Sequence, residues 1–440
     1  MLVRFWGTRG SLAKPGPSTL RYGGNTSCVE VRTAAGTLFV LDCGTGAHGL
    51  GQALVAGRER VRGHLLITHT HWDHIQGFPF FAPLFSPGNE WDIYAPGGLG
   101  LKLEQTLAGQ MEYTYFPVTL AQLGATIRYH DLAEGHFAVD DVRVIGKYLN
   151  HPALALGYRL EVGSVAVVYS SDHEPHAAPL AAAGGTFAHH EDRRHVEFLA
   201  GADLIVHDAQ YSLDEYRDKV GWGHTPAECA VDYAVGAGAR RLALYHHDPM
   251  RDDDAIERLL DACRHRAAAV GGELEVFAAA EGQAIELAEA GSARPDAPRV
   301  AKKTPSAGGQ ETILVADDDP AIVMLLRASL EADGYRVVTA ADGEAALRVA
   351  RAERPALLLL DWQMPGSSGI EVTRALRDDA SAELRAVPVV LITAQAGTEN
   401  TAVGFAAGVT DYLTKPFRPA HVRARVRTWL LRQAAGPTEA

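Results

Sequence analysis

The segment HLLITHTHWDHIQG, residues 64–77, constrains the fold more than any other part of the sequence, and its apolar residues 65–67 are typical of a buried strand. Four groups that are costly to bury without partners follow at once: His69, His71, Asp73 and His74. Residues two apart in an extended segment point the same way, so His69 and His71 can hold one ion. Asp73 and His74 then turn toward a second position. Imidazole and carboxylate ligands suit Zn²⁺, Mn²⁺ or Fe, so the segment predicts a two-metal site.

The composition is that of a folded globular protein, with 47% hydrophobic and 22% charged residues and no apolar run long enough to span a membrane. The first residues lack the apolar core of a signal peptide, so we expect a cytoplasmic protein that does not bind a membrane. A formal charge of −13 disfavours non-specific binding to nucleic acid. The cysteines lie far apart and form no CxxC, which favours small buried residues over disulfides or metal ligands.

Residues 291–310 divide the sequence into two parts. They have no hydrophobic periodicity and are rich in Pro, Gly, Ala, Ser and Lys, which predicts an exposed, flexible linker. Residues 1–290 mix apolar strands with helices. Residues 311–433 alternate strands and helices more regularly, and this pattern favours a doubly wound parallel sheet. We expect an α/β protein of two domains, with residues 434–440 as a tail.

The motifs of the N-terminal part resemble, in their order, those of the metallo-β-lactamase superfamily. The resemblance implies an αββα sandwich in which His151, in YLNHPALALG, is a further ligand of the first ion. It also implies that Asp172, in VVYSSDHEP, bridges both ions. The last ligand falls in LALYHHDP, where the family pattern points to His246 and leaves His247 as the alternative. Asp42, at the end of a strand in VLDCG, matches a group that orients a ligand imidazole.

Two further motifs narrow the substrate, because a metal pair that activates water serves esters, lactones, thioesters and phosphodiesters alike. Asp208 in DLIVHDAQY and His224 in GWGHTPAECA resemble motifs of the tRNase Z branch and related phosphodiesterases. In that branch an acidic residue orients a histidine that protonates the leaving alkoxide, which assigns these catalytic roles to Asp208 and His224, beside Asp73. The alternative for His224 is a histidine at a helix entry. No basic arm for a tRNA is visible, so we expect a cyclic nucleotide or another small phosphodiester.

Three other sets of residues have weaker patterns. Arg9 and Arg21 could bring positive charge to a phosphate. Five aromatic residues could line a wall for a base, although core packing is the expected role of most: Phe78, Phe80, Phe81, Phe85 and Trp91. We interpret AHHEDRRH, which contains His189 and His195, as a solvated loop or helix.

In residues 311–433, acidic and polar groups stand at the ends of predicted strands. They are Asp317 and Asp318 after the first strand, Asp361 at the third, Thr393 at the fourth and Lys415 at the fifth. Strand C-termini share one edge of a parallel sheet, so these side chains should converge. Carboxylates bind Mg²⁺ through oxygen, and one of them can attack a phosphoryl donor to form an aspartyl phosphate.

This second arrangement resembles the response-regulator receiver domain, which has a (βα)5 flavodoxin-like fold. The resemblance makes Asp361 the phosphoacceptor. It assigns the receiver magnesium to Asp317, Asp318 and the backbone carbonyl of Gln363. It assigns the contacts to the phosphoryl oxygens to Thr393 and Lys415, and it makes Tyr412 the aromatic switch.

Together the two parts predict a two-component response regulator whose output is a dinuclear-metal phosphodiesterase controlled by phosphorylation of Asp361. We expect two transition-metal ions, with zinc favoured over manganese or iron, and magnesium in the receiver. No kinase motif is visible, so the phosphoryl group would come from a sensor histidine kinase or a small phosphodonor, and the receiver could also form a homodimer. Two alternatives stay open, namely a dimetal hydrolase of a lactone or thioester and a non-catalytic metal-binding signalling module.

Overall fold

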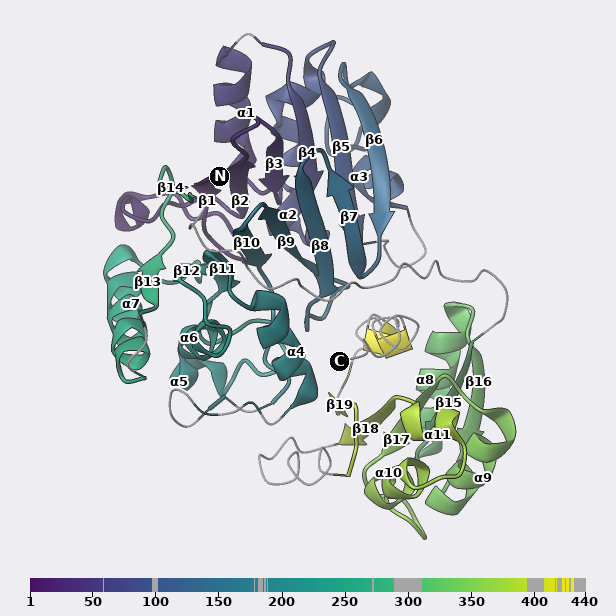
Figure 1. The fold of residues 1–440 in the computed structure, drawn as a ribbon. Helices are drawn as coiled ribbons and strands as arrows, with labels where there is room; N and C mark the ends of the chain where they lie inside the picture. Colours follow the sequence, from purple (N-terminus) through teal and green to yellow (C-terminus); the bar gives the residue numbers. More distant parts are fainter. Residues whose placement is uncertain are drawn as a thin grey trace. The chain divides into compact units, whose positions relative to one another are not determined.

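The computed structural model describes most of the chain, namely residues 1–57, 59–96, 102–177, 179–180, 185, 187, 189–270, 273–288, 311–393, 407–415, 417, 422–423, 425–426 and 429–430. The predicted linker and tail lie outside these residues. The chain divides into two compact units, one containing Met1–Pro175 and Pro179–Val300 and the other containing Ala301–Ala440 (Figure 1). The boundaries that we set at residues 290 and 311 border the undescribed stretch, so they stay predictions.

A sheet in the order β14-β1-β2-β3-β4-β5-β6 forms one half of the first unit (Figure 1). Its strands are β1 (Leu2–Gly7), β2 (Cys28–Arg32), β3 (Leu38–Leu41), β4 (Arg62–Leu66), β5 (Glu90–Pro96), β6 (Thr126–Leu132) and β14 (Ala284–Glu286). Every residue of β3 is buried, and Leu38 and Val40 join the core under helix α1 (Ala47–Ala56). Because side chains alternate across a strand, Phe39 and Leu41 point to the other face, so the sheet is covered on both sides.

A second sheet, in the order β13-β12-β11-β10-β9-β8-β7, forms the other half. Its strands are β7 (Gly135–Val139), β8 (Val142–Tyr148), β9 (Leu156–Val162), β10 (Val165–Ser170), β11 (Leu204–Asp208), β12 (Arg241–Tyr245) and β13 (Glu275–Ala278). Its outer face shares a core with α4 (His190–Leu199), α6 (Ala227–Gly236) and α7 (Asp253–Ala268). The remaining helices are α2 (Trp72–Ile75), α3 (Leu103–Gln110), α5 (Leu213–Tyr216) and the 3-10 turns η1 (Pro17–Thr19), η2 (Phe78–Phe80), η3 (Ala82–Phe85) and η4 (Leu120–Gln122).

The two sheets pack face to face through aromatic side chains. The ring of Phe5, on β1, lies 6.1 Å from the ring of Tyr245 on β12 and 6.4 Å from that of Phe277 on β13. The hydroxyl of Tyr158, on β9, donates to the carbonyl of Ile67 at 2.7 Å. Helices outside two such sheets make the αββα sandwich that the sequence predicted (Figure 1). Among the described residues, no helix combines the length and the apolar surface needed to cross a membrane.

The structure corrects one sequence interpretation and refines another. His189 and His195 are buried, so a solvated AHHEDRRH segment is wrong: α4 packs against α6, and the ring of His195 stacks 3.8 Å from that of His173. The aromatic residues after the HTHWDH segment are mostly core. Phe78, Phe81 and Trp91 are fully buried, whereas Phe80 is 55% exposed.

The second unit is a parallel sheet in the order β16-β15-β17-β18-β19, which is the predicted doubly wound pattern. Its strands are β15 (Thr312–Ala316), β16 (Arg336–Ala340), β17 (Leu357–Asp361), β18 (Val389–Thr393) and β19 (Asp411–Thr414). Its helices are α8 (Pro320–Ala332), α9 (Gly343–Glu353), α10 (Gly369–Arg377) and α11 (Ala382–Ala386). One core lies between the sheet and α9, α10 and α11, and α8 packs in a core on the other face.

The buried guanidinium of Arg9 joins the start of the first unit to the segment before α7. It donates to the carbonyls of Gly23 at 2.8 Å and Arg251 at 2.7 Å, and it lies 3.8 Å from the carboxylate of Asp253. Arg21 pairs instead with acids of α7. Both arginines therefore have structural contacts that the sequence did not indicate.

Replacing Arg9 with methionine should destabilise the first unit by about 2 kcal/mol or more, because it leaves the carbonyls of Gly23 and Arg251 without their donor and removes the positive charge beside the carboxylate of Asp253. Urea unfolding of the full chain measures this as a lower midpoint for that unit. Arg217→Met is the matched control, because the Arg217 side chain is 80% exposed and its removal should cost less than about 0.5 kcal/mol. Equal midpoints for the two variants would contradict the structural role of Arg9.

Candidate functional site

The candidate site lies where strands of both sheets end. Asp42 follows β3, His69 follows β4, Asp172 follows β10 and His246 follows β12. Three of these residues, Asp42, Asp172 and His246, have φ of 59°, a left-handed conformation that residues other than glycine rarely adopt. Such strain persists only where the surrounding structure holds it, and it collects at functional sites.

Four side chains make the first of two groups that could hold an ion: His69, His71, His151 and Asp172. All their ligand atoms lie within 4.8 Å of one another. His151 Nε2 is 3.2 Å from His71 Nδ1, and His69 Nε2 is 3.7 Å from Asp172 Oδ2. The buried Nε2 of His69 has no hydrogen-bond partner in the described part of the chain. An ion between these atoms would satisfy it, so the residues fit a metal.

The second group shares Asp172 with the first and adds three side chains: Asp73, His74 and His246. His74 Nε2 lies 3.1 Å from Asp172 Oδ1 and 3.2 Å from Asp73 Oδ2. His246 Nε2 lies 3.2 Å and 3.1 Å from the same two oxygens. The oxygens of Asp172 thus face one group each, Oδ2 the first and Oδ1 the second. The structure brings together every residue that the sequence proposed as a metal ligand.

His246, and not His247, reaches this centre. The neighbouring His247 turns away, and its Nε2 donates to the carbonyl of Ala279 at 2.9 Å. Burial lowers the pKa of His247 to about 3, so it is neutral. Gly10 explains part of the close packing, because a Cβ there would collide with the ring of His246. The sequence left both histidines open, since spacing alone does not say which one faces the centre.

In three of the candidate histidine ligands, the ring nitrogen that faces away from the metal group is hydrogen-bonded to the protein. Asp42 Oδ2 accepts from His74 Nδ1 at 2.7 Å, and this contact fits the expectation that Asp42 orients a ligand imidazole. Gln210 Oε1 accepts from His246 Nδ1 at 2.9 Å, and the carbonyl of Gly223 accepts from His151 Nδ1 at 3.0 Å. Such partners fix the tautomer and the orientation of a ligand imidazole. Sequence reasoning missed Gln210 and Gly223, because nothing in their local motifs says which distant ring they will meet.

Burial and charge set the protonation states of these groups. Burial lowers the pKa of His69 well below its ordinary value and that of His151 to about 3. Burial alone would raise the pKa of Asp73 and Asp172, but the neighbouring histidines hold both well below the usual range. Burial also opposes a charge on His74, but the carboxylates of Asp73, Asp172 and Asp42 outweigh it and raise its pKa well above the ordinary value. Histidines bind metal ions as neutral imidazoles, so an ion at this position would displace the proton of His74.

Asp208 and His224 form a pair beside the centre. His224 Nδ1 lies 2.9 Å from Asp208 Oδ2 and 3.9 Å from Asp172 Oδ2. Asp208 also accepts from the backbone N–H of Gln210 at 3.0 Å. Burial opposes a charge on His224, but the carboxylates of Asp208 and Asp172 outweigh it and raise its pKa to about 9. His224 is therefore a cation at neutral pH, with one N–H committed to Asp208.

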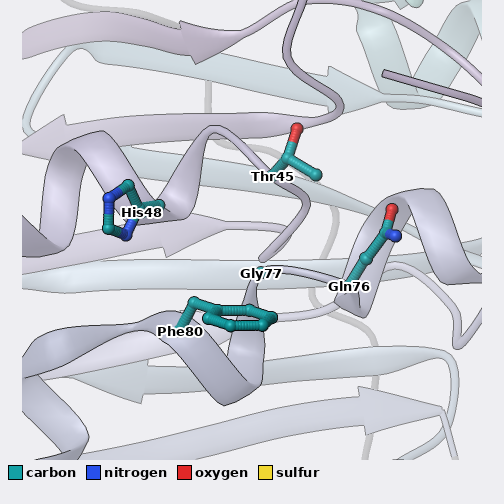
Figure 2. Close-up of a pocket in the computed structure, with 5 residues that line it drawn as sticks. All are labelled: Thr45, His48, Gln76, Gly77 and Phe80. Carbon is teal, nitrogen blue, oxygen red and sulfur yellow. The ribbon is translucent and has the colours of Figure 1, made fainter.

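An open hollow of about 270 Å³ is lined by residues that follow Asp42 and His74 closely in the sequence (Figure 2). Thr45, His48, Gln76, Gly77 and Phe80 line it, and none of them belongs to the two metal groups. Figure 2 shows the ring of Phe80 on one side of this hollow and His48 beside it. It has no cluster of charged or metal-binding groups.

The second unit gathers its own predicted residues at one edge of its sheet. Asp317, Asp318 and Asp361 lie together as a possible cation site. Lys415 Nζ donates to Asp317 at 2.8 Å and to Asp361 at 2.6 Å. Burial opposes the charge on Lys415, but these two carboxylates raise its pKa. Thr393 ends β18 as expected.

Gln363 and Tyr412 lie close to this edge. The backbone N–H of Gln363 donates to Asp361 Oδ2 at 3.1 Å, which places this residue directly at the carboxylate. Tyr412, on β19, is half-buried, and its ring lies 6.2 Å from that of Trp362. Burial raises the pKa of Tyr412.

Comparison with known proteins agrees with this division. Residues 37–247 match the Beta-lactamase superfamily domain, and residues 313–427 match the Response regulator receiver domain. The DNA-binding response regulator MtrA of Mycolicibacterium smegmatis is 40% identical over 130 residues, which are 30% of this chain and 55% of that protein. The chain spans about half the length of the curated relatives it matches.

Two solved structures resemble the first unit. The metallo-beta-lactamase fold protein YhfI from Bacillus subtilis aligns with a TM-score of 0.46 and 20% identity, over 65% of this chain and 99% of that one. The short form of human tRNase Z aligns with a TM-score of 0.43 and 21% identity, over 66% of this chain and all of that one. The family matches confirm the resemblances to the metallo-β-lactamase superfamily and to the receiver domain. The chain carries an N-terminal domain of the beta-lactamase superfamily, with a metallo-β-lactamase fold, and a C-terminal response regulator receiver domain.

Proposed function

We propose that this protein is a response regulator whose output is a dinuclear-metal phosphodiesterase, acting on cyclic nucleotides or another small phosphodiester. The superfamily of the first domain supports a metal-dependent hydrolase and implies divalent metal. The receiver implies a phosphodonor partner such as a histidine kinase. The observation that carries the phosphodiesterase is the pair of Asp208 and His224, 2.9 Å apart and beside the carboxylate of Asp172.

Two ions would occupy the two groups of side chains. His69, His71 and His151 would hold the first, whereas Asp73, His74 and His246 would hold the second, and Asp172 would bind both. All the candidate ligands are imidazole nitrogens or carboxylate oxygens. This set favours zinc, with manganese or iron as alternatives. When bound, such a pair activates water for attack and stabilises negative charge on the attacked centre.

His224 would act as the general acid. Asp208 accepts its Nδ1–H and fixes the ring, so the proton on Nε2 is the one available for transfer. A pKa of about 9 keeps that proton in place at neutral pH. An alkoxide that leaves phosphorus is a strong base and needs a proton, whereas the leaving group of a thioester needs it far less. A third possible cation group contains Asp208 and His224, but the hydrogen bond between them favours an acid pair.

The receiver would control this activity through Asp361. Asp317, Asp318 and the carbonyl of Gln363 would hold magnesium, and Asp361 would take the phosphoryl group from a sensor kinase or a small phosphodonor. Lys415 already contacts Asp361 and would neutralise the added charge. Thr393 and Tyr412 would carry the change to the surface of the domain.

The replacement Asp73→Ala should lower metal-dependent hydrolysis of bis(p-nitrophenyl) phosphate and of cyclic nucleotides at least about 100-fold. Loss of a residue that only hydrogen-bonds to a metal ligand typically costs about 10–100-fold, and Asp73 would be a ligand itself. Turnover and metal content are measured together, with Asp214→Ala as the control, since the Asp214 side chain is 89% exposed. A wild-type protein that binds about two metals per chain and hydrolyses no phosphodiester would sink the proposal and favour a lactone or thioester. A protein that binds no metal would favour a non-catalytic module.

The pH profile tests the acid pair. The protonated form of His224 is required, so kcat/KM should be high below its pKa of about 9 and fall as the pH rises through that value. Asp208→Asn removes the charge that raises this pKa, so the basic limb should move to lower pH by about one unit or more. Asp214→Asn should leave the limb in place. An identical limb in Asp208→Asn would show that His224 is not the titrating acid.

Phosphorylation tests the receiver. Acetyl phosphate with magnesium should add about one phosphoryl group per chain and change the rate of phosphodiester hydrolysis, and Asp361→Asn should abolish both effects. Gel retardation of the phosphoprotein and the hydrolysis rate are the two readouts. Asp378→Asn, at an exposed acid of the same domain, is the control. Phosphorylation at Asp361 without any change in hydrolysis would refute control of the output by the receiver.

A further inference from the structure

Two tryptophan side chains are exposed beside the metal centre. Trp72 lies between the candidate ligands His71 and Asp73, and it is 74% exposed. Trp222 is 55% exposed and precedes Gly223, whose carbonyl holds His151. Large aromatic side chains normally bury most of their surface, so two exposed indoles next to one site call for a functional explanation.

Both tryptophans are sequence neighbours of residues that belong to the first metal group or contact it directly. His71 is the exposed member of the first metal group, whereas the other members are buried. His71 Nδ1 lies 3.2 Å from His151 Nε2, and His151 Nδ1 lies 3.0 Å from the carbonyl of Gly223. Trp72 is bonded to one end of this short chain of contacts and Trp222 to the other. Both tryptophans therefore belong to segments close to His71, the exposed member of the group.

The loop that carries Trp222 is held in place by a buried carboxylate. Glu174 accepts from the hydroxyl of Tyr216 at 2.7 Å and from the backbone N–H groups of Gly221 at 2.6 Å and Gly223 at 2.8 Å. Gly223 has φ of 88°, and a Cβ at this position would collide with His151. Trp222 is thus presented to solvent by a fixed loop, which lowers the entropy cost of stacking a ligand on it.

A positive charge stands on the same loop. Lys219 Nζ lies 4.3 Å from the centre of the Trp222 ring, within the range of a cation–π contact. The protein as a whole has a formal charge of −13. A lysine and an indole on the loop that contacts His151 match a substrate that is anionic and carries a flat aromatic group.

We propose that Trp72, Trp222 and Lys219 form a recognition site for the aromatic group of a nucleotide-like phosphodiester. This inference rests on the proposed function and narrows its substrate class. Trp222 stacks on the aromatic base, Trp72 borders it from the side of the metal ligands, and Lys219 draws in the anion. Stacking on aromatic side chains accepts any base, so the site selects for the presence of a base and not for its identity.

Two diesters with the same leaving group test the proposal, namely thymidine 5′-p-nitrophenyl phosphate and methyl p-nitrophenyl phosphate. Trp222→Ala in the full-length, metal-loaded protein should lower kcat/KM for the thymidine diester about tenfold or more, mainly through KM, because it removes a stacking surface. It should leave the methyl diester within about twofold. Trp222→Phe should restore most of the loss, and Trp72→Ala should act in the same direction with unchanged metal content.

Tyr113→Ala is the control for removing an exposed aromatic residue elsewhere, since Tyr113 is 81% exposed. It should change neither rate. Equal losses on both diesters in Trp222→Ala would mean that Trp222 only supports the loop, and no loss on either would mean that it has no role; both results overturn the recognition site and leave the phosphodiesterase intact. A wild-type protein that hydrolyses neither diester would overturn the proposed function together with this inference.

Discussion

The carboxylate of Asp172 is the contact on which the candidate site depends. Its Oδ2 faces His69 and His151 at 3.7 and 3.9 Å, and its Oδ1 faces His74 and His246 at 3.1 and 3.2 Å. One short side chain therefore sets the spacing of two groups that come from both sheets of the sandwich. The backbone of Asp172 has a strained φ of 59°, because the chain turns directly after a buried strand. Packing of the two sheets on either side stabilises this conformation.

Around the ligands, groups from other segments of the chain fix three of the histidine rings. Asp42 holds His74, Gln210 holds His246 and the carbonyl of Gly223 holds His151. Preorganised ligands lose little freedom when an ion binds, so affinity should follow the integrity of the whole fold. The segment around Gly223 also carries the proposed acid, His224, and the exposed indole of Trp222. Glu174 fixes this loop, so a ligand, the acid and the recognition site share one support.

The sequence predicted the fold and the candidate ligands because both leave local signals. Apolar runs that end near His69 or in Asp361 mark strand ends, and in the second unit the ends of the parallel strands meet. In the first unit, the resemblance to the metallo-β-lactamase superfamily supplied His151, Asp172 and His246. Pairing between distant segments leaves no such signal. Nothing in the sequence near Gln210 shows that this residue holds His246. The sequence around Arg9 likewise does not distinguish it from an ordinary surface arginine. His195 was misread because a helix rich in charges usually faces water, whereas α4 turns this histidine inward against α6.

The most direct test of this account is the position of the metals themselves. Anomalous diffraction from crystals of the metal-loaded protein should locate two ions, one among His69, His71 and His151 and the other among Asp73, His74 and His246. An oxygen of Asp172 should bind each ion, and His224 should bind neither. A single ion, or an ion held between Asp208 and His224, would contradict both the shared role of Asp172 and the assignment of His224 as an acid.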